Sequence, residues 1–429
     1  MLLRVVAGLL LGTMTVGTQV SSKHEITLDV EVQSELIAAV EVLCDHCAWD
    51  VPGREGVFLT AAVDRRYAAH IPVFRTGRAT YDVLLGTVPP GRHTVMVGLD
   101  PARTPRMVRA NVSWRLDRVN ANSTPDPALE FAPFLYARSE SMERFTDVPV
   151  FMWYEVEPAG IGTRYRYSVI FTNEDGGTPS DRLMATWGRT TDIEYIYSVV
   201  VDANGKVLAD DYQGPDHVTT PFRGQREGRH PLLWVSTHNN MVRDRGDTQV
   251  RYALSPQLFP LVNTSREAVM DANPWLYEVM ARELAREGKI VPDAPPGRDA
   301  IPDPRRFVYI ESCGEVGTSA LAFSVRARST WLASDRGVPE YRIVRDGCAR
   351  AAVPLPGGVE ESDIDTIRAH AYERPPRKDA PPPKPTPVRL TRINAVFMLD
   401  ATYRPRPSLF QWKGSQTIAP GDHAGFTLP

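Results

Sequence analysis

Two carboxylates open the most informative segment of the chain, residues 190–202. Asp192 and Glu194 lie two apart in a run of β-branched and aromatic residues, and alternate side chains of a strand share a face. Their carboxylates then lie roughly 7 Å apart, where they repel unless a cation or a shared proton joins them. We therefore predict a site for Ca²⁺ or Mg²⁺, both of which prefer oxygen ligands. The alternatives are a solvated strand face, or an ion pair with Arg189 or Arg243.

A second polar cluster ends the strand-like run 230–240. His238 lies where this run passes into a loop, a frequent position of functional side chains, and it is the third predicted metal ligand. The long segment 203–229 between the two runs is expected to be a loop, and it could supply further ligands to the cation. Three more residues of these segments are predicted to bind a ligand: His217, Asn239 and Trp234.

These two segments together resemble the Vps62-like proteins and, more distantly, the necrosis-inducing secreted proteins. The matching residues are Gly188, Asp192 and Glu194 in the first segment and His230, Pro231 and His238 in the second. The resemblance covers about 60 residues and implies a β-sandwich on which the acidic pair helps to hold a divalent cation. The sequence departs from the family pattern because Ile193 replaces an aromatic residue and 189–191 lacks the expected histidine.

Other candidates for chemistry are weaker. Glu155 and Glu157 alternate on a predicted strand and could form a glycosidase pair or an exposed strand face. Tryptophans could line a sugar-binding groove or fill the cores: Trp153, Trp187, Trp234, Trp331 and Trp412. No Gly-x-Ser-x-Gly, His-Glu-x-x-His, Walker or Gly-x-Gly-x-x-Gly motif occurs, which disfavours the common esterase, zincin and nucleotide-binding functions.

The four cysteines predict two disulfides. Cys313 and Cys348 each border a strand-like run, and a bridge between them would close a moderate loop. Cys44 and Cys47 form a Cys-x-x-Cys spacing followed by a turn rather than by a helix. A local structural disulfide is the favoured interpretation for this second pair, with free thiols, a redox pair or a metal site as alternatives.

The elements that must position these residues are mainly strands. Short β-branched runs separated by Gly and Pro turns predict a mostly β protein built of antiparallel β-sandwich domains with a short helical insertion. The expected organisation is a small N-terminal sandwich at 25–120 and a larger sandwich domain at 129–429. The larger domain holds the helical insertion at 264–288, where Asn273 is the expected N-cap of the main helix, and a proline-rich strap at 374–388.

The N-terminus predicts export. Residues 1–22 carry one arginine, a short apolar run and a small-residue end, which is the pattern of a cleaved signal peptide. No later run is long and apolar enough to predict a transmembrane segment. The 49 basic and 52 acidic residues nearly cancel, so nucleic acid is not an expected partner. We expect an extracytoplasmic location, periplasmic or secreted.

The expected function follows from these features. A non-catalytic binding or cell-envelope-associated protein, recognising glycan or envelope components, is favoured because sandwich modules occur without a catalytic motif. The alternative is a divalent-metal-dependent hydrolase acting on glycan or lipid, suggested by Asp192, Glu194 and His238.

Overall fold

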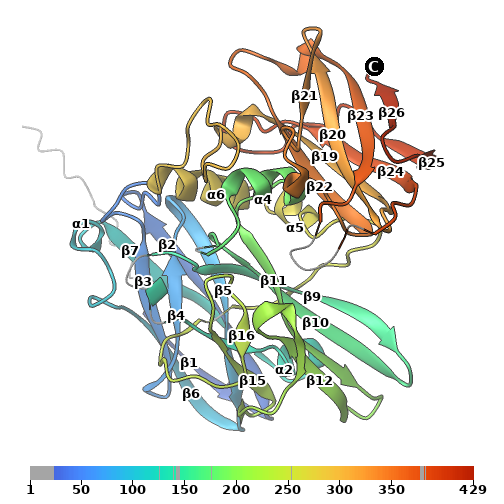
Figure 1. Cartoon of the computed structure of the whole chain (residues 1–429). Helices are drawn as coiled ribbons and strands as arrows, with labels where there is room; N and C mark the ends of the chain where they lie inside the picture. Colours follow the sequence, from blue (N-terminus) through green and yellow to red (C-terminus); the bar gives the residue numbers. More distant parts are fainter. Residues whose placement is uncertain are drawn as a thin grey trace, which may run out of the picture.

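The computed structural model describes residues 24–124, 126–138, 140–141, 145–174, 176–252, 254–376, 381 and 383–429. The predicted signal peptide at 1–22 lies outside these residues, as do 377–380 and 382 of the predicted strap. The described residues are mainly strands, which form five sheets with largely antiparallel pairing (Figure 1). The predicted fold class, mostly β with antiparallel sandwiches and a short helical insertion, is confirmed.

The N-terminal part is a sandwich of two sheets. One sheet has the order β1-β6-β3-β4 and the other the order β5-β2-β7. Apolar residues such as Val40, Leu59 and Val95 are fully buried between them. The strands are β1 (Glu25–Val30), β2 (Ser34–Cys44), β3 (Val57–Val63), β4 (Arg66–Val73), β5 (Gly77–Val88), β6 (Gly91–Leu99) and β7 (Val112–Asn122).

The first of these sheets continues into the middle of the chain. β4 pairs in parallel with β17, which pairs with β8, so the order runs on as β17-β8-β15-β14. The added strands and two short helices are α1 (Arg106–Arg109), α2 (Pro127–Glu130), β8 (Phe134–Tyr136), β14 (Arg226–Glu227), β15 (His230–Val235), β16 (Val242–Arg243) and β17 (Arg251–Tyr252). His230 is fully buried in this sheet, where its ring nitrogens contact Glu35 Oε2 at 3.0 Å and the Ala132 carbonyl oxygen at 2.9 Å.

A second central sheet has the order β13-β12-β11-β10-β9-β18. One of its faces packs on the first sheet through buried residues that include Val169, Tyr197 and Leu233. The strands are β9 (Pro149–Ala159), β10 (Gly162–Phe171), β11 (Asp192–Val201), β12 (Val207–Gln213), β13 (Thr219–Pro221) and β18 (Gln257–Leu258), with η1 (Pro215–His217) between β12 and β13. The predicted loop at 203–229 therefore contains strand β12, which pairs with β11 on one side and with the edge strand β13 on the other.

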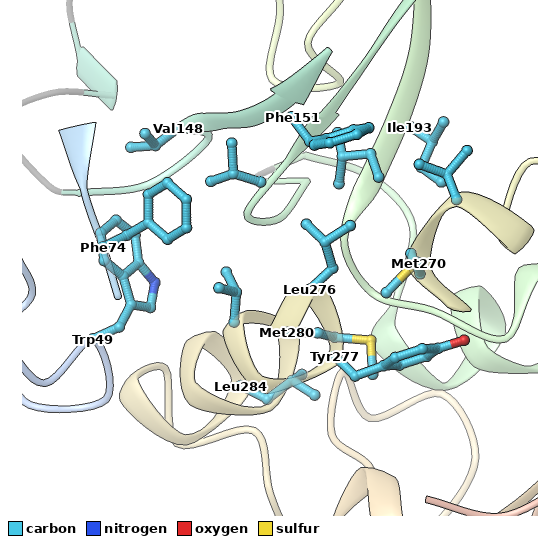
Figure 2. Close-up of a cluster of buried hydrophobic side chains, with 14 of the residues drawn as sticks. Trp49, Phe74, Val148, Phe151, Ile193, Met270, Leu276, Tyr277, Met280 and Leu284 are labelled. Atoms are coloured by element: carbon cyan, nitrogen blue, oxygen red, sulfur yellow. The ribbon is translucent and has the colours of Figure 1, made fainter. Parts of the chain in front are cut away.

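Helices cover the opposite face of the second central sheet. α5 (Ala268–Ala272) and α6 (Trp275–Arg286) bury Met270, Leu276 and Met280 against Phe151 of β9 and Ile193 of β11 (Figure 2). Each fully buried side chain of this size stabilises the packing by about 1.5–3 kcal/mol. Figure 2 also shows Trp49 and Phe74 of the N-terminal sandwich at the edge of the same cluster. The insertion therefore joins the sandwiches.

Two helical details differ from the sequence prediction. Asn273 ends α5, and its side-chain amide donates to the Val269 carbonyl oxygen, so it does not cap α6. The helix α4 (Ser180–Trp187) was not predicted from the sequence. Pro179 before this helix and Gly188 after it, at φ +63°, carry the proline-start and glycine-end signal that could have identified it.

The C-terminal part is a further sandwich with its own core. Within region 129–429, where one larger sandwich was predicted, a separate set of residues such as Val308, Phe323 and Ile367 is buried between two four-stranded sheets. The strands are β19 (Phe307–Glu315), β20 (Ser319–Ala327), β21 (Thr330–Ala333), β22 (Gly347–Pro354), β23 (Ile364–Glu373), β24 (Val388–Phe397), β25 (Trp412–Ile418) and β26 (His423–Thr427). Short 3₁₀ turns join them: η2 (Pro304–Arg306), η3 (Pro339–Tyr341) and η4 (Glu361–Asp363).

Both cysteine pairs form disulfides in the structure. Cys44 bonds to Cys47 at the end of β2, and Cys313 bonds to Cys348 across the paired strands β19 and β22. The structural-disulfide interpretation of the Cys-x-x-Cys spacing is therefore confirmed over the free-thiol alternative.

Candidate functional site

Asp192 and Glu194 lie at the start of β11, on the face that packs toward the first central sheet. Their intervening neighbour Ile193 points into the helix-covered cluster (Figure 2), and strand alternation turns the two carboxylates the other way. The exposed fractions of Asp192 and Glu194 are only 4% and 8%. The alternative of a solvated strand face is therefore wrong.

A bulge in β11 changes the face of the sheet on which Tyr197 lies. The pairing with β10 matches Val169 with Glu194 and Tyr167 with Tyr197, skipping one residue of β11. Tyr197 therefore shares the inner face with Glu194, whereas uninterrupted alternation along β11 would place it on the opposite face.

An amide side chain binds each buried carboxylate. Asn240 donates from Nδ2 to Asp192 Oδ2 at 2.9 Å and also to the Asn173 carbonyl oxygen at 3.0 Å. Gln213, at the end of β12, donates from Nε2 to Glu194 Oε2 at 2.7 Å. Asn240 is fully buried and has φ +55°, a left-handed backbone conformation that asparagine tolerates better than most residues. The loop after β15 thus turns sharply to bring its amide to Asp192.

A third carboxyl group, Glu174, belongs to the same electrostatic cluster. Burial and the nearby Asp192 charge raise the pKa of Glu174 to about 7. Burial also raises the pKa of Asp192, and burial together with the Asp192 charge raises the pKa of Glu194 well above its ordinary value. The cluster therefore favours taking up positive charge, either as protons or as a cation.

The nearby arginines offset this effect only partly. Arg189 and Arg266 lower the pKa values of the acidic pair, but Arg189 donates to Glu267 Oε1 at 3.0 Å and to the Thr191 carbonyl oxygen. Arg266 donates to the Ile193 carbonyl oxygen at 3.2 Å. The pairing of Arg189 with Glu267 explains why its guanidinium does not neutralise Asp192 directly.

Two oxygens of the cluster have no hydrogen-bond partner among the residues that the structure describes. They are Oε1 of Glu174 and Oδ1 of Asn240, and both atoms are buried. Buried oxygens in this state are costly, and oxygen atoms of these two types are suitable ligands for Ca²⁺ or Mg²⁺. Among the described residues, no three His, Cys, Asp or Glu side chains are placed to hold a metal ion. A cation here would therefore need the amide oxygen of Asn240 beside the carboxylates.

The structure separates the predicted histidines. His238 is exposed, and its Nδ1 lies 2.8 Å from Nη1 of Arg138, which also forms an ion pair with the buried Asp147. His217 is also exposed, but its Nδ1 lies 3.0 Å from Nε2 of Gln213, the donor to Glu194. Of the two histidines, His217 is thus the one linked to the acidic pair by described contacts. Asn239 is half-buried beside Asn240 in the same loop.

Trp234 lies in a separate groove of about 570 Å³. Its indole stacks on the Tyr136 ring, with centroids 4.7 Å apart and planes 14° from parallel, and its Nε1 donates to the Thr248 carbonyl oxygen. The side chains of Arg223, Gln225 and Gln249 are exposed around this pair. The groove therefore combines an aromatic wall with planar polar end groups.

Two further sequence candidates, Trp153 and Glu157, have ordinary structural roles. Trp153 is fully buried in the helix-covered cluster. Glu157 forms an ion pair with Arg166 on the next strand, Oε1 to Nη1 at 3.2 Å, whereas burial raises the pKa of Glu155. The sequence did not single out Glu174, Gln213 or Asn240. Gln213 lies in segment 203–229, which was expected to supply further ligands, and Asn240 ends the run 230–240, whereas Glu174 lies three residues after the end of β10.

Comparisons with known proteins give weak structural matches only. No family model and no curated protein matches the sequence. A structure described as NLPPya in complex with mannosamine matches with 11% identity and a TM-score of 0.23, covering 30% of this chain and 70% of that one. Necrosis and Ethylene inducing Protein 2, from the causal agent of cocoa's Witches Broom disease, matches with 12% identity and a TM-score of 0.23, covering 31% and 74%. A GH2 beta-galacturonidase from Eisenbergiella tayi bound to galacturonate matches with 8% identity and a TM-score of 0.13, covering 44% and 29%. These values indicate a weak structural resemblance to necrosis-inducing proteins and assign neither a family nor an activity.

Proposed function

We propose that this chain is an exported, non-catalytic glycan-binding protein whose saccharide site is the groove around Trp234. The observation that supports the proposal is the composition of the groove, an aromatic pair surrounded by planar polar groups in a volume of about 570 Å³. Ligand sites of small molecules have volumes of roughly 300–1,000 Å³ with aromatic walls and a few polar groups. The two disulfides fit export, because such bonds persist in oxidising compartments.

The chemistry of the groove matches that of a sugar ring. The C–H face of a saccharide can pack against the edge of the Tyr136–Trp234 pair as apolar surface. Its hydroxyls need groups that both donate and accept, and the exposed amides of Gln225 and Gln249 supply both. The guanidinium of Arg223 adds further donors at the rim.

A glycan array followed by isothermal titration of the bound glycans tests this proposal. The variant Gln225→Ala should weaken binding about fivefold, since it removes roughly 1 kcal/mol of hydrogen bonding. Gln416→Ala, on the exposed part of β25 in the C-terminal sandwich, is the matched control and should bind as the wild type does. An array without any bound glycan, or equal affinities for both variants, would contradict the proposal.

We also propose that the acidic cluster binds a divalent cation, Ca²⁺ or Mg²⁺. Asp192 and one neighbouring glutamate, Glu174 or Glu194, would supply carboxylate oxygens and Asn240 an amide oxygen, and the cation would supply the positive charge that the raised pKa values favour. Because His217 reaches Glu194 through Gln213, a bound cation could also order the turn at the end of β12. Titration of chelator-treated protein with CaCl₂ and MgCl₂ should give a binding heat that Asp192→Asn abolishes and Asp29→Asn, an exposed control on β1, retains.

A hydrolase acting on glycan or lipid is the second candidate, and one observation favours it. The pKa of Glu174, raised to about 7, lies in the range of an efficient general acid or base near neutral pH. A panel of chromogenic glycoside and ester substrates, run with and without chelator on the protein used for the array, distinguishes the two functions. Turnover that requires both the metal and Glu174 would replace the binding function by the hydrolase.

A further inference from the structure

A basic pocket lies between α4 and the C-terminal sandwich, apart from both sites described above. It has a volume of about 360 Å³. Its lining includes one carboxylate, Glu340, and four arginines: Arg182, Arg342, Arg345 and Arg374. Trp187, at the end of α4, and the backbone run 374–376 provide apolar walls.

The positive charge of this pocket is only partly compensated. Arg342 pairs with Asp335, Nε to Oδ2 at 2.9 Å, and Arg374 donates to the carbonyl oxygens of Gly317 and Val344. Arg345 donates only to the Thr186 carbonyl oxygen at 3.2 Å, and Arg182 forms no ion pair with any described carboxylate. Three guanidinium groups of the pocket, those of Arg182, Arg345 and Arg374, therefore lack a carboxylate partner within the described part of the chain.

Two nitrogens of the pocket, Nε of Arg182 and Nε of Arg374, are buried without a hydrogen-bond partner among the described residues. Burial, together with the charges of Arg266 and Arg189 and against the opposing charge of Glu267, lowers the pKa of Arg345 to about 10. A buried positive charge with unpaired donors is costly, and an oxyanion accepting from several guanidinium groups would remove that cost.

The aromatic wall defines the rest of the ligand. The guanidinium of Arg345 lies 5.1 Å from the centroid of the Trp187 ring. If the anionic group of a ligand binds Arg345, the rest of the ligand therefore lies beside the indole. Ile343 and Pro375 extend this apolar surface. A bare inorganic ion would satisfy the arginines but would leave the apolar wall uncovered.

We propose that this pocket binds a small organic phosphate, with the phosphate held by Arg182 and Arg345 and an apolar or aromatic body packed on Trp187. Arginine forms paired hydrogen bonds with phosphate oxygens, and a phosphate presents enough acceptors for guanidinium groups on different sides of the pocket. The pocket shares no lining residue with the Trp234 groove or the acidic cluster, so this proposal stands or falls separately from the proposals for those two sites.

Isothermal titration of the full chain with phenyl phosphate, inorganic phosphate and phenol tests the proposal at matched ionic strength. Phenyl phosphate should bind most tightly, inorganic phosphate more weakly, and phenol should show no heat. Arg345→Ala should weaken the binding of phenyl phosphate at least tenfold, since a hydrogen bond to a charged group is lost. Arg345→Lys should weaken it as well, because lysine keeps the charge but loses the paired donors.

Controls separate this site from general electrostatic attraction and from loss of folding. Arg92→Ala, an exposed arginine on β6, removes the same charge far from the pocket and should leave binding unchanged. Trp187→Leu should reduce the advantage of phenyl phosphate over inorganic phosphate while inorganic phosphate still binds. Equal heats for phenyl phosphate and sodium chloride, or equal weakening by Arg92→Ala and Arg345→Ala, would overturn the proposal.

Discussion

Replacing Glu174 by glutamine should stabilise the protein, and the gain should grow with pH. Burial and the Asp192 charge raise the pKa of Glu174 from 4.5 to about 7 in the folded protein. Below pH 4.5 the carboxyl is protonated in both folded and unfolded chains, so it adds no pH-dependent term to the free energy of unfolding. As the pH rises from about 4.5 to 7, the unfolded chain ionises first, and the folded state becomes progressively less stable relative to it. Above pH 7 this loss is complete.

The size of the gain follows from the same pKa. A rise from 4.5 to about 7 corresponds to roughly 3 kcal/mol, at 1.36 kcal/mol per pKa unit. Glu174 is only partly buried, so solvent screening reduces this to about 2 kcal/mol. Glutamine has the same shape and does not titrate. Glu174→Gln should therefore increase the free energy of unfolding by about 2 kcal/mol more at pH 8 than at pH 5.

Urea denaturation of the wild type and the variant at several pH values measures how the gain in the free energy of unfolding changes with pH. Effects of the substitution that do not depend on pH cancel in this comparison. Glu373→Gln, at the exposed end of β23, is the matched control and should show no such trend. Saturating Ca²⁺ should remove the advantage of glutamine if the cation compensates the ionised cluster. An equal effect of Glu174→Gln at pH 5 and pH 8 would refute the electrostatic account of the cluster.

Three further outcomes are expected. Ca²⁺ or Mg²⁺ at a hundredfold excess over its dissociation constant should stabilise the fold by about 2.7 kcal/mol, seen as a higher melting temperature that Asp192→Ala abolishes; a melt indifferent to metal and chelator would remove the site. Replacing both Cys313 and Cys348 by alanine should lower the free energy of unfolding by about 3–4 kcal/mol, because their bridge closes a loop of 35 residues; chemical denaturation without reductant measures it, and an unchanged midpoint would contradict the estimate. Arg350→Ala should lower the free energy of unfolding by about 3–5 kcal/mol, because this fully buried arginine pairs with Glu311 and its loss leaves that carboxylate uncompensated. Thermal melting measures this loss, and a change below about 1 kcal/mol would show that the cavity is hydrated.

The local sequence pattern was sufficient to predict the strands and the shared strand face of Asp192 and Glu194. Alternating β-branched runs predicted the strands, and the two-residue spacing of Asp192 and Glu194 placed both carboxylates on one face of β11, as the structure shows. The cysteines were also predictable from position, because Cys313 and Cys348 border strands that pair directly with each other. These features depend on neighbours in the chain or on strand periodicity, which the sequence carries explicitly.

Only the tertiary structure decided that the acidic pair is buried and which side chains form hydrogen bonds with it. Packing of the two central sheets buries Asp192 and Glu194, a step that strand periodicity cannot reveal because polar alternation usually indicates the solvent face. Asn240 reaches Asp192 from 48 positions along the chain. It does so only because the loop after β15 adopts a left-handed turn beside β11.

The same limit applies to the basic pocket and to the histidines. The arginines of the basic pocket come from α4 and from segments after η3 and β23, which no local motif connects. The sequence favoured His238 over His217 as a metal ligand, yet of these two histidines only His217 is linked to Glu194 by contacts of the described residues, through Gln213. The chain's residue order determined which side chains lie on each strand and helix, whereas the packing of distant segments determined which of them meet, because each such contact depends on the whole fold.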